Sequence, residues 1–471
     1  MRPRVLVVHP PVSIARDFID YPYFADLGAV QLAAVVRERD AEVRLIDAYA
    51  LSGSSLASRP DGRAHLGASV AEVLDHARSF AETLSAGDLV AVITTPFHRP
   101  PARDDVMADL LVGLRSLAPH ASLLIVDAYQ SGQHYVEADG AAMLASYPEV
   151  DAWLKYEAEE TLGSLLSART PPRGVYDGAE VSSLDALALP AWDLVDLAAH
   201  DRFLSRVIAN VGRGGWEFPI DGRTLPMVTS RGCPFSCAHC SSNPGRLSGA
   251  PKLQRRLSTT RLRTSIEALV RTHGATRLEV LDELVNVSER HFDAFLEIVG
   301  EAGVAFDIPN GMRADYLEER HFSKMKGRVR TVSVSAESGV QRVIDEVVGK
   351  RLDLSTIVRA AKNAHQAGVR LMIHYIIGLP GETETEIEST LDFALDLFRR
   401  YGAWPAVQFA TPLPGTALAR GRSLPVVSDW GPLFQTKPSQ PGALMPPELL
   451  LSRKRAFDVT LRELEREARA R

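Results

Sequence analysis

Hydrophobic residues in the first third of the chain fall into short, nearly continuous runs that alternate with stretches of helical periodicity. The runs "RVLVVH", "LVAVIT" and "SLLIV" are rich in Val, Ile and Leu, as strands buried on both faces of a sheet are. Between them, "LGAVQLAAVVRERD" and "DDVMADLLVGLRSL" carry apolar residues at helical spacing. This alternation predicts an α/β fold, with a doubly wound parallel sheet over residues 1–168.

A Pro-, Gly- and Ser-rich stretch follows, and it predicts a linker over residues 169–218. A second alternation occupies residues 219–420, with predicted strands at "LPMVTS", "RLEVLDE", "AFDIPNGM", "TVSVSAE", "RLMIHYIIG" and "AVQFATPL". Helical patterns separate these strands, so we expect a partial (β/α)6 barrel, shorter than the eight-unit barrel. Residues 421–471 are predicted to form a C-terminal extension. It holds a Pro-rich segment with Trp430 and Phe434, which is either a lid or a surface connection, and a final helix.

Composition and charge narrow the class of protein. The chain is 45% hydrophobic and 24% charged, which is ordinary for a globular protein. A net charge of −6, with neither a basic tail nor a basic stripe, argues against a nucleic-acid or membrane-surface binder. No apolar run approaches the ~18 residues of a membrane span, and the run at the N-terminus is too short for a signal peptide. We therefore expect a cytoplasmic protein with no nucleic-acid or membrane partner.

The three cysteines of the chain, Cys233, Cys237 and Cys240, all lie in "RGCPFSCAHC", directly after the first strand of the second alternation. Active sites of α/β folds collect at the C-terminal ends of strands, so this position suits chemistry. Three interpretations are open at this point. The thiols are buried by chance, or they bind zinc together with a histidine such as His239, or they hold a [4Fe–4S] cluster. In the third case, three ligands leave one iron open for a substrate or cofactor.

The C-x3-C-x2-C spacing and five later phrases resemble the radical S-adenosylmethionine (SAM) superfamily. The phrases, each at the end of a predicted strand, are "LDE" (281–283), "NGMRADYL" (310–317), "VSAESG" (334–339), "YIIGLPGET" (375–383) and "TPLPGT" (411–416). The resemblance implies that the open iron binds the amino and carboxylate groups of SAM. An electron from the cluster then cleaves SAM to methionine and a 5′-deoxyadenosyl radical. It also implies a flavodoxin- or ferredoxin-type electron donor.

The same resemblance assigns seven residues to SAM. They are His239, Asp282, Glu283, Arg313, Glu337, Ser338 and Gly378. His239 would lie by the adenine, and Asp282 and Glu283 would pair with the methionine ammonium. Glu337 would meet the ribose or the methionine carboxylate. Each position also has a plainer interpretation, as a solvated loop acid, a structural hydrogen-bonding residue or part of a turn into a capped helix.

The first third of the chain resembles the cobalamin-binding domain that precedes many radical SAM cores, a Rossmann-like fold. "VLVVHPP" with the helix and strand that follow it carries the resemblance, and "YPEVDAWLKYEAEETL" resembles the closing phrase of that domain. The corrin would lie across the C-terminal strand ends. The residues assigned to it are His9, Pro10, Thr94, Thr95, Gln130, Ser131 and Gly132, with His98 nearby. A scaffold domain that does not bind cobalamin is the alternative, because Asp127-Ala128 stands where the family has Gly-Gly.

Taken together, the resemblance implies a cobalamin-dependent radical SAM enzyme. The commonest activity of such enzymes is methylation of an unactivated carbon, through a 5′-deoxyadenosyl radical and methylcobalamin. We expect a small metabolite or natural-product intermediate as the substrate. Two alternatives stay open. One is a radical SAM enzyme that catalyses a cyclisation, rearrangement or other oxidoreductive step, with cobalamin non-methylating or absent. The other is a non-enzymatic corrinoid or iron–sulfur sensor.

Overall fold

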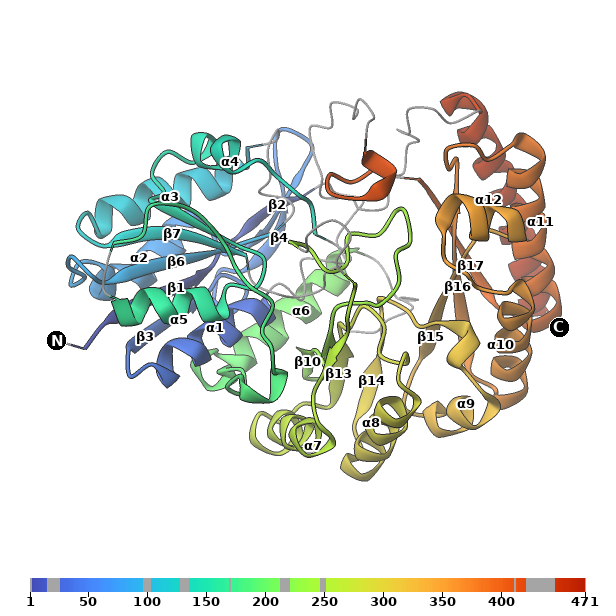
Figure 1. Cartoon of the computed structure of the whole chain (residues 1–471), viewed down its shortest axis with the longest axis horizontal. Coiled ribbons are helices and arrows are strands. Elements are labelled where there is room, and N and C mark those ends of the chain that lie inside the picture. Colours follow the sequence, from blue (N-terminus) through green and yellow to red (C-terminus); the bar gives the residue numbers. More distant parts are fainter. Residues whose placement is uncertain are drawn as a thin grey trace.

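A computed structural model describes residues 2–14, 26–95, 103–127, 135–168, 171–211, 221–245, 251–410, 412–420 and 445–470. Two α/β units stand next to each other in this structure (Figure 1). We call them the first domain and the barrel. Within the described residues, no helix combines the length and the apolar character needed to cross a membrane.

The first domain is built on a six-stranded sheet with the order β3-β1-β6-β7-β8-β9, in which every pair is parallel. Its strands are β1 (Arg4–His9), β3 (Glu42–Asp47), β6 (Leu89–Thr94), β7 (Ser122–Asp127), β8 (Ala152–Lys155) and β9 (Gly174–Asp177). The order reverses between β1 and β6, which is the position where open α/β sheets bind ligands. The predicted doubly wound sheet is confirmed.

Helices cover both faces of this sheet (Figure 1). One face packs against α1 (Asp26–Glu38) and α5 (Glu159–Ala168). The other packs against α2 (Val70–Ala81), α3 (Asp105–Leu117) and α4 (Gly140–Ser146). Each helix on the second face begins after a Ser or Asp whose side chain accepts a hydrogen bond from the first turn, as helix N-caps do.

Three features of the first domain differ from the sequence-based expectation. The last strand, β9, lies in the predicted linker. It was not predicted because it is a short edge strand in which exposed and half-buried residues alternate, with no buried apolar run. Helix α6 (Leu197–Val211) also lies in that linker. A small antiparallel sheet of β2 (Val12–Ile14), β5 (Ala64–Gly67) and β4 (Ser55–Ser58) was not predicted. Its strands have three or four residues, too few to show a clear period.

The barrel has six parallel strands in two groups, β10-β13-β14 and β15-β16-β17. They are β10 (Thr224–Met227), β13 (Arg277–Val280), β14 (Ala305–Asp307), β15 (Thr331–Glu337), β16 (Arg370–Ile377) and β17 (Trp404–Phe409). A parallel bridge between Met312 and Val334 joins the two groups. The predicted partial barrel of six strands is confirmed.

The helices of the barrel lie on its outer side (Figure 1). They are α7 (Thr259–Glu267), α8 (Glu289–Ala302), α9 (Glu319–Met325), α10 (Leu354–Ala367), α11 (Glu384–Tyr401) and α12 (Pro447–Ala470). The final helix, α12, packs against α11. The apolar residues of the barrel and those under α1 and α5 form one continuous cluster, so the two units share a core.

Candidate functional site

The three cysteines lie at the C-terminal end of the first barrel strand. They follow β11 (Ser230–Arg231), which pairs with β12 (Arg255–Arg256), and we call residues 232–254 the cysteine loop. All three are free thiols; Cys233 is buried, and Cys237 and Cys240 are half-buried. Burial raises the pKa of the Cys233 thiol to about 12 and that of the Cys237 thiol to about 11. Metal binding would release these protons, because the thiolate is the ligand.

The start of the cysteine loop is held by side chains that come from outside it or from its far end. Glu283 accepts a hydrogen bond from the Gly232 backbone N at 3.0 Å. Asn243 accepts one from the Cys233 N at 2.9 Å and donates to the Leu253 carbonyl at 3.0 Å. Gly232 has a φ of +84°, and a Cβ there would lie 2.5 Å from the Leu253 carbonyl oxygen, so only glycine fits. Asn243 was missed by the sequence analysis, because its role depends on these contacts.

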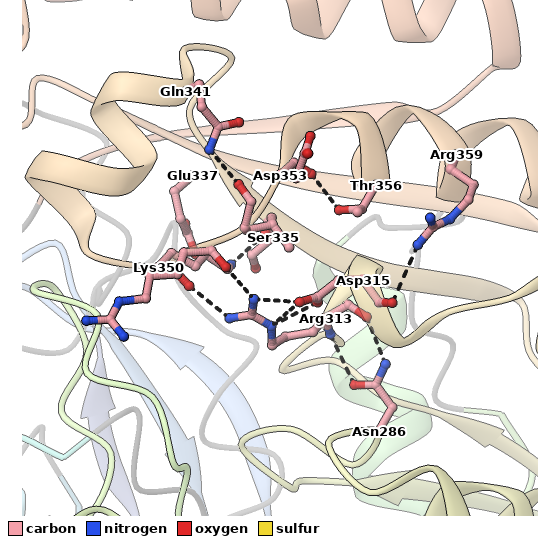
Figure 2. Close-up of polar contacts among 12 residues, drawn as sticks. Asn286, Arg313, Asp315, Ser335, Glu337, Gln341, Lys350, Asp353, Thr356 and Arg359 are labelled. Carbon is pink, nitrogen blue, oxygen red and sulfur yellow. Dashed lines mark hydrogen bonds and ion pairs between the residues drawn. The ribbon is translucent and has the colours of Figure 1, made fainter.

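Arg313 is held by the hydrogen bonds that Figure 2 shows, and it also contacts the cysteine loop. Its side chain is almost fully buried and donates to Asp315 at 2.7 and 2.9 Å. It also donates to the carbonyls of Lys350 and Arg351, each at 3.1 Å. The guanidinium carbon lies 4.0 Å from the centre of the Phe235 ring, which belongs to the cysteine loop. Arg313 thus braces the loop, and its assignment to SAM stays a prediction.

A buried charged pair lies next to the cysteine loop. Lys350 donates to Glu337 at 2.8 Å and to the Ser335 carbonyl at 2.5 Å. His239 Nε2 lies 3.7 Å from the same Glu337 oxygen. Burial alone would raise the pKa of Glu337, but Lys350 and His239 hold it below its ordinary value. Glu337 and His239 thus lie close together, whereas Lys350 was missed, because nothing in "VVGKR" distinguishes a buried lysine from an exposed one.

A second histidine lies in the same part of the barrel. His374 is half-buried on β16, directly opposite Ser335 of β15, and its Nε2 lies 2.8 Å from the Ser333 hydroxyl. Burial lowers the pKa of His374 to about 4, so the imidazole is neutral at pH 7. The sequence analysis treated this residue only as part of a strand. It adds a neutral hydrogen-bonding group below the cysteine loop.

Asp282 does not face the site. It is fully buried, and Thr229 donates to it from its backbone N at 2.6 Å and from its hydroxyl at 2.7 Å. The Ser230 hydroxyl donates to it as well. Burial raises the pKa of Asp282 to about 6. Both carboxylate oxygens thus join the end of β13 to the segment before the cysteine loop, and the assignment of Asp282 to the methionine ammonium stays a prediction.

Ser338 and Gly378 are also used by the fold itself. The Ser338 hydroxyl is buried and lies 2.9 Å from the Thr390 hydroxyl of α11. Gly378 donates its backbone N–H to Glu382 at 2.8 Å, has a φ of +80°, and would bring a Cβ to 3.0 Å from Leu450 of α12. The space beside Gly378 is filled by a helix, and the assignment of the two residues to SAM stays a prediction.

The residues assigned to cobalamin that the structure describes are all buried, and their assignment stays a prediction. His9, at the end of β1, is fully buried, and its Nδ1 lies 2.8 Å from Asp47. Thr94, at the end of β6, donates to Asp127 at 2.7 Å. Pro10 and Thr95 are buried at the same edge of the sheet. Seven other residues singled out in the sequence lie outside the described residues: His98, Gln130, Ser131, Gly132, Thr411, Trp430 and Phe434.

The C-terminal edges of the two units meet each other. The Glu137 N–H, in the segment after β7, donates to the Pro414 carbonyl, in the segment after β17, at 3.1 Å. Gly245 of the cysteine loop lies against the ring of Tyr156, which follows β8. A ligand held at one edge would therefore lie close to the other edge.

Within the described part of the chain, no group of three or more His, Cys, Asp and Glu side chains is arranged to hold one metal ion. Zinc needs four ligands at about 2.0–2.3 Å around one point. A four-iron cluster is wider, so its thiolate ligands stand further apart.

A partial βα barrel with three thiols on the loop after its first strand defines the class of protein. Residues 227–394 match the family model described as the radical SAM superfamily. The barrel is therefore a radical SAM domain, and the resemblance found in the sequence is confirmed.

Known relatives and structures agree with this class. The chain is 29% identical over 251 residues to "uncharacterized methyltransferase PH0819" of Pyrococcus horikoshii, which covers 53% of this chain and 48% of that protein. It is 26% identical over 283 residues to the anaerobic magnesium-protoporphyrin IX monomethyl ester cyclase of Rubrivivax gelatinosus, covering 56% and 49%. The chain thus matches about half the length of these relatives.

The fold of both units together is that of a solved structure. The radical SAM methyltransferase TsrM of Kitasatospora setae, with cobalamin and a [4Fe–4S] cluster bound, aligns with a TM-score of 0.60 at 14% identity. The alignment covers 89% of this chain and 74% of TsrM. The first domain and the barrel are thus arranged in the same way in both proteins.

Proposed function

We propose that this protein is a cobalamin-dependent radical SAM enzyme that methylates a carbon of a small molecule. One observation carries the proposal: the loop with three free thiols, on a radical SAM barrel, contacts the C-terminal edge of a doubly wound sheet through Gly245 and Tyr156, in a fold like that of TsrM. TsrM is described as a methyltransferase with cobalamin and a [4Fe–4S] cluster bound. A small-molecule substrate and a flavodoxin- or ferredoxin-type electron donor remain predictions.

Cys233, Cys237 and Cys240 would hold the [4Fe–4S] cluster. When bound, a cluster with one open iron supplies the electron and the coordination site for reductive cleavage of SAM. Hydrogen bonds from Gly232 and Cys233 to Glu283 and Asn243 hold the backbone at the start of the loop.

Polar groups for SAM and the substrate are available around Glu337. This ionised carboxylate can accept hydrogen bonds from ribose hydroxyls or from an ammonium group. Lys350 neutralises it, His239 Nε2 lies 3.7 Å from it, and the buried His239 Nδ1 has no protein partner within the described residues. His374 is neutral and lies in the barrel, so it would hydrogen-bond to a polar group of the substrate without adding charge.

Cobalamin would lie at the C-terminal edge of the first sheet, near the reversal of strand order between β1 and β6. His9 is fully buried with its Nδ1 directed at Asp47, so we do not assign it to cobalt. Gln130, Ser131 and Gly132, which follow β7, stay assigned to the corrin as a proposal.

The proposal is tested by anaerobic incubation of the reconstituted protein with SAM, cobalamin and a chemical reductant. We expect methionine and 5′-deoxyadenosine, together with transfer of labelled methyl groups from SAM to cobalamin. A Cys240→Ala variant is the control and should form no 5′-deoxyadenosine. If the protein holds about four irons and still leaves SAM intact, the proposal is wrong and a sensor becomes the better interpretation.

A radical cyclisation is the second candidate function. The relative from Rubrivivax gelatinosus is named a cyclase and matches over 283 residues. The same experiment separates the two candidates. Formation of 5′-deoxyadenosine without any methyl transfer to cobalamin would favour cyclisation or another rearrangement.

A further inference from the structure

The two ends of the cysteine loop are joined to the first domain by arginine–carboxylate pairs. Arg231 directly precedes the loop and Arg255 directly follows it, and the two residues are paired across β11 and β12. Arg231 donates to Glu157 at 3.2 Å and to Glu159 at 2.7 Å. Arg255 donates to both oxygens of Glu157, one of them at 2.9 Å. The four residues form what we call the four-charge cluster.

The four-charge cluster is shielded from solvent. The side chains of Arg231, Glu157 and Glu159 are 2%, 5% and 3% exposed, and that of Arg255 is 13% exposed. Burying charges to this extent costs folding free energy unless the charges are paired. Well-packed apolar residues at the same positions would often stabilise the contact between the two units equally well. Burial of two arginines against two carboxylates at this position therefore suggests a requirement for geometry rather than for stability alone.

The carboxylates of the cluster belong to a segment that is fixed to the strand ends of the first sheet. Glu157 follows Tyr156, whose backbone N donates to Asp127 at 3.1 Å. Asp127 ends β7 and also accepts hydrogen bonds from Thr94 and from the Trp153 indole. A continuous set of hydrogen bonds and covalent links thus runs from the strand ends of β6 and β7 to both ends of the cysteine loop.

We propose that Glu157 and Glu159 are positioning residues for the iron–sulfur cluster, acting through Arg231 and Arg255. The two glutamates hold the two ends of the cysteine loop. The first domain thereby fixes the position of the loop relative to the C-terminal edge of the first sheet, where a ligand of that domain would bind. This inference rests on the proposed function, because it takes the cysteine loop as the cluster site. The Glu-x-Glu phrase thereby has a role in the barrel, although it lies in the first domain.

The test uses the full chain with Glu157→Gln and Glu159→Gln, which remove charge and keep shape. The matched control is Asp193→Asn, because Asp193 also pairs with an arginine, Arg37, but its side chain is 53% exposed. Three quantities are measured after anaerobic reconstitution: iron per chain, the rate of iron loss to a chelator, and the electron paramagnetic resonance spectrum of the reduced cluster with and without SAM.

Iron should leave the two Gln variants about ten- to a hundredfold faster than it leaves the wild type, as for other groups that orient metal ligands. The spectral change caused by SAM should be smaller or absent in both variants. The control should match the wild type in all three quantities. Arg255→Lys keeps the charge but loses the bidentate contact with Glu157. Its rate of iron loss should therefore lie between those of the wild type and Glu157→Gln.

The outcomes separate this inference from the proposed function. A wild type that binds no iron contradicts the proposed function. The positioning role is overturned if the wild type and the Gln variants bind equal amounts of iron, release it at the same rate and give the same spectra. This holds even if the variants melt at a lower temperature. If the Gln variants do not fold, Arg255→Lys decides by the same criteria, and wild-type release and spectra in that variant overturn the inference.

Discussion

The C-terminal strand edges of the two units use their polar side chains differently. At the barrel edge, the three thiols are free and the buried His239 Nδ1 has no protein partner among the described residues. At the edge of the first sheet, Thr94 and His9 Nδ1 are each hydrogen-bonded to a buried aspartate, and His9 Nε2 lacks a protein partner in the described part of the chain. A polar side chain at a strand end is thus either a candidate ligand or a brace, that is, a residue whose hydrogen bonds hold the fold, and its partners decide which. The barrel edge carries candidate ligand atoms on a loop that such residues hold in place. The described part of the first edge carries mainly braces.

Removal of a thiol from the barrel edge should have the largest effect of the variants considered, because it removes a candidate ligand. Cys237→Ala leaves two thiolates, which do not hold a four-iron cluster. We expect iron to fall from about four per chain to below about one after anaerobic reconstitution. Unchanged circular dichroism would show that the fold is kept. Full iron loading of the variant would contradict the assignment of the cluster to this loop.

Removal of a brace at the barrel edge should cost stability even without a cluster. Arg313→Leu strands the Asp315 carboxylate and the carbonyls of Lys350 and Arg351, so the free energy of unfolding should fall by about 3–5 kcal/mol. Urea unfolding of the metal-free protein measures this change.

The matched control is Arg400→Leu, which removes an arginine from an exposed ion pair with Asp396. Its loss should be about 0.5 kcal/mol or less. Equal losses in the two variants would mean that Arg313 is not a brace.

The inner wall of the barrel predicts a pH dependence. Glu279 and Asp307 lie opposite each other on β13 and β14, and neither oxygen of the fully buried Glu279 has a protein partner in the described part of the chain. Burial raises the pKa of Asp307 to about 7 and that of Glu279 well above its ordinary value. The folded state therefore holds protons that the unfolded state releases near pH 4.

For a group with a raised pKa, stability is lost as pH rises through the folded-state pKa. Together the two carboxyls should lower the free energy of unfolding by about 2–4 kcal/mol between pH 5 and pH 8. Buried histidines such as His374, whose pKa is lowered, change the stability in the opposite direction, so the wild type is compared with Glu279→Gln. This variant removes one of the two carboxyls, and its stability should fall less with pH than that of the wild type, as measured by urea unfolding across this range. Equal pH profiles of the two proteins would contradict this account of the inner wall.

The smallest effect is expected at the first edge. His9→Gln should lower the free energy of unfolding by about 1–3 kcal/mol, because Asp47 loses a buried partner. The visible spectrum of bound cobalamin should not change, since His9 Nδ1 is directed at Asp47 and the ring is fully buried. A shifted corrin spectrum in this variant would show that His9 contacts the cofactor and would remove the contrast between the two edges.

The sequence predicted the strands and helices of the barrel well, because each has a strong apolar period and is bounded by turn residues. It also located the cysteine loop. It could not tell ligands from braces: Asp282 and Glu337 both end strands, yet one bonds to Thr229 and the other to Lys350. Such partners lie 53 and 13 residues away along the chain, so only the folded structure shows them.

Other misses have local causes. The predicted linker hid α6, because the Pro- and Gly-rich composition before and after this helix outweighed its apolar period. Arg231 and Arg255 flank the cysteine loop, and the sequence indicates only ordinary surface charges there. Arginine is rarely buried without a partner, and no partner is visible near them in the sequence. Their carboxylate partners lie in a different unit, 72 to 98 residues away.

The central claim is that two ligand edges, one for an iron–sulfur cluster and one for cobalamin, face each other in one chain. Anaerobic reconstitution with iron, sulfide and cobalamin, followed by gel filtration, tests it most directly. We predict about four irons and one corrin per chain, with a visible spectrum that shows both. Iron without corrin would reduce the first domain to a scaffold and contradict the claim, and loss of both would refute the site itself.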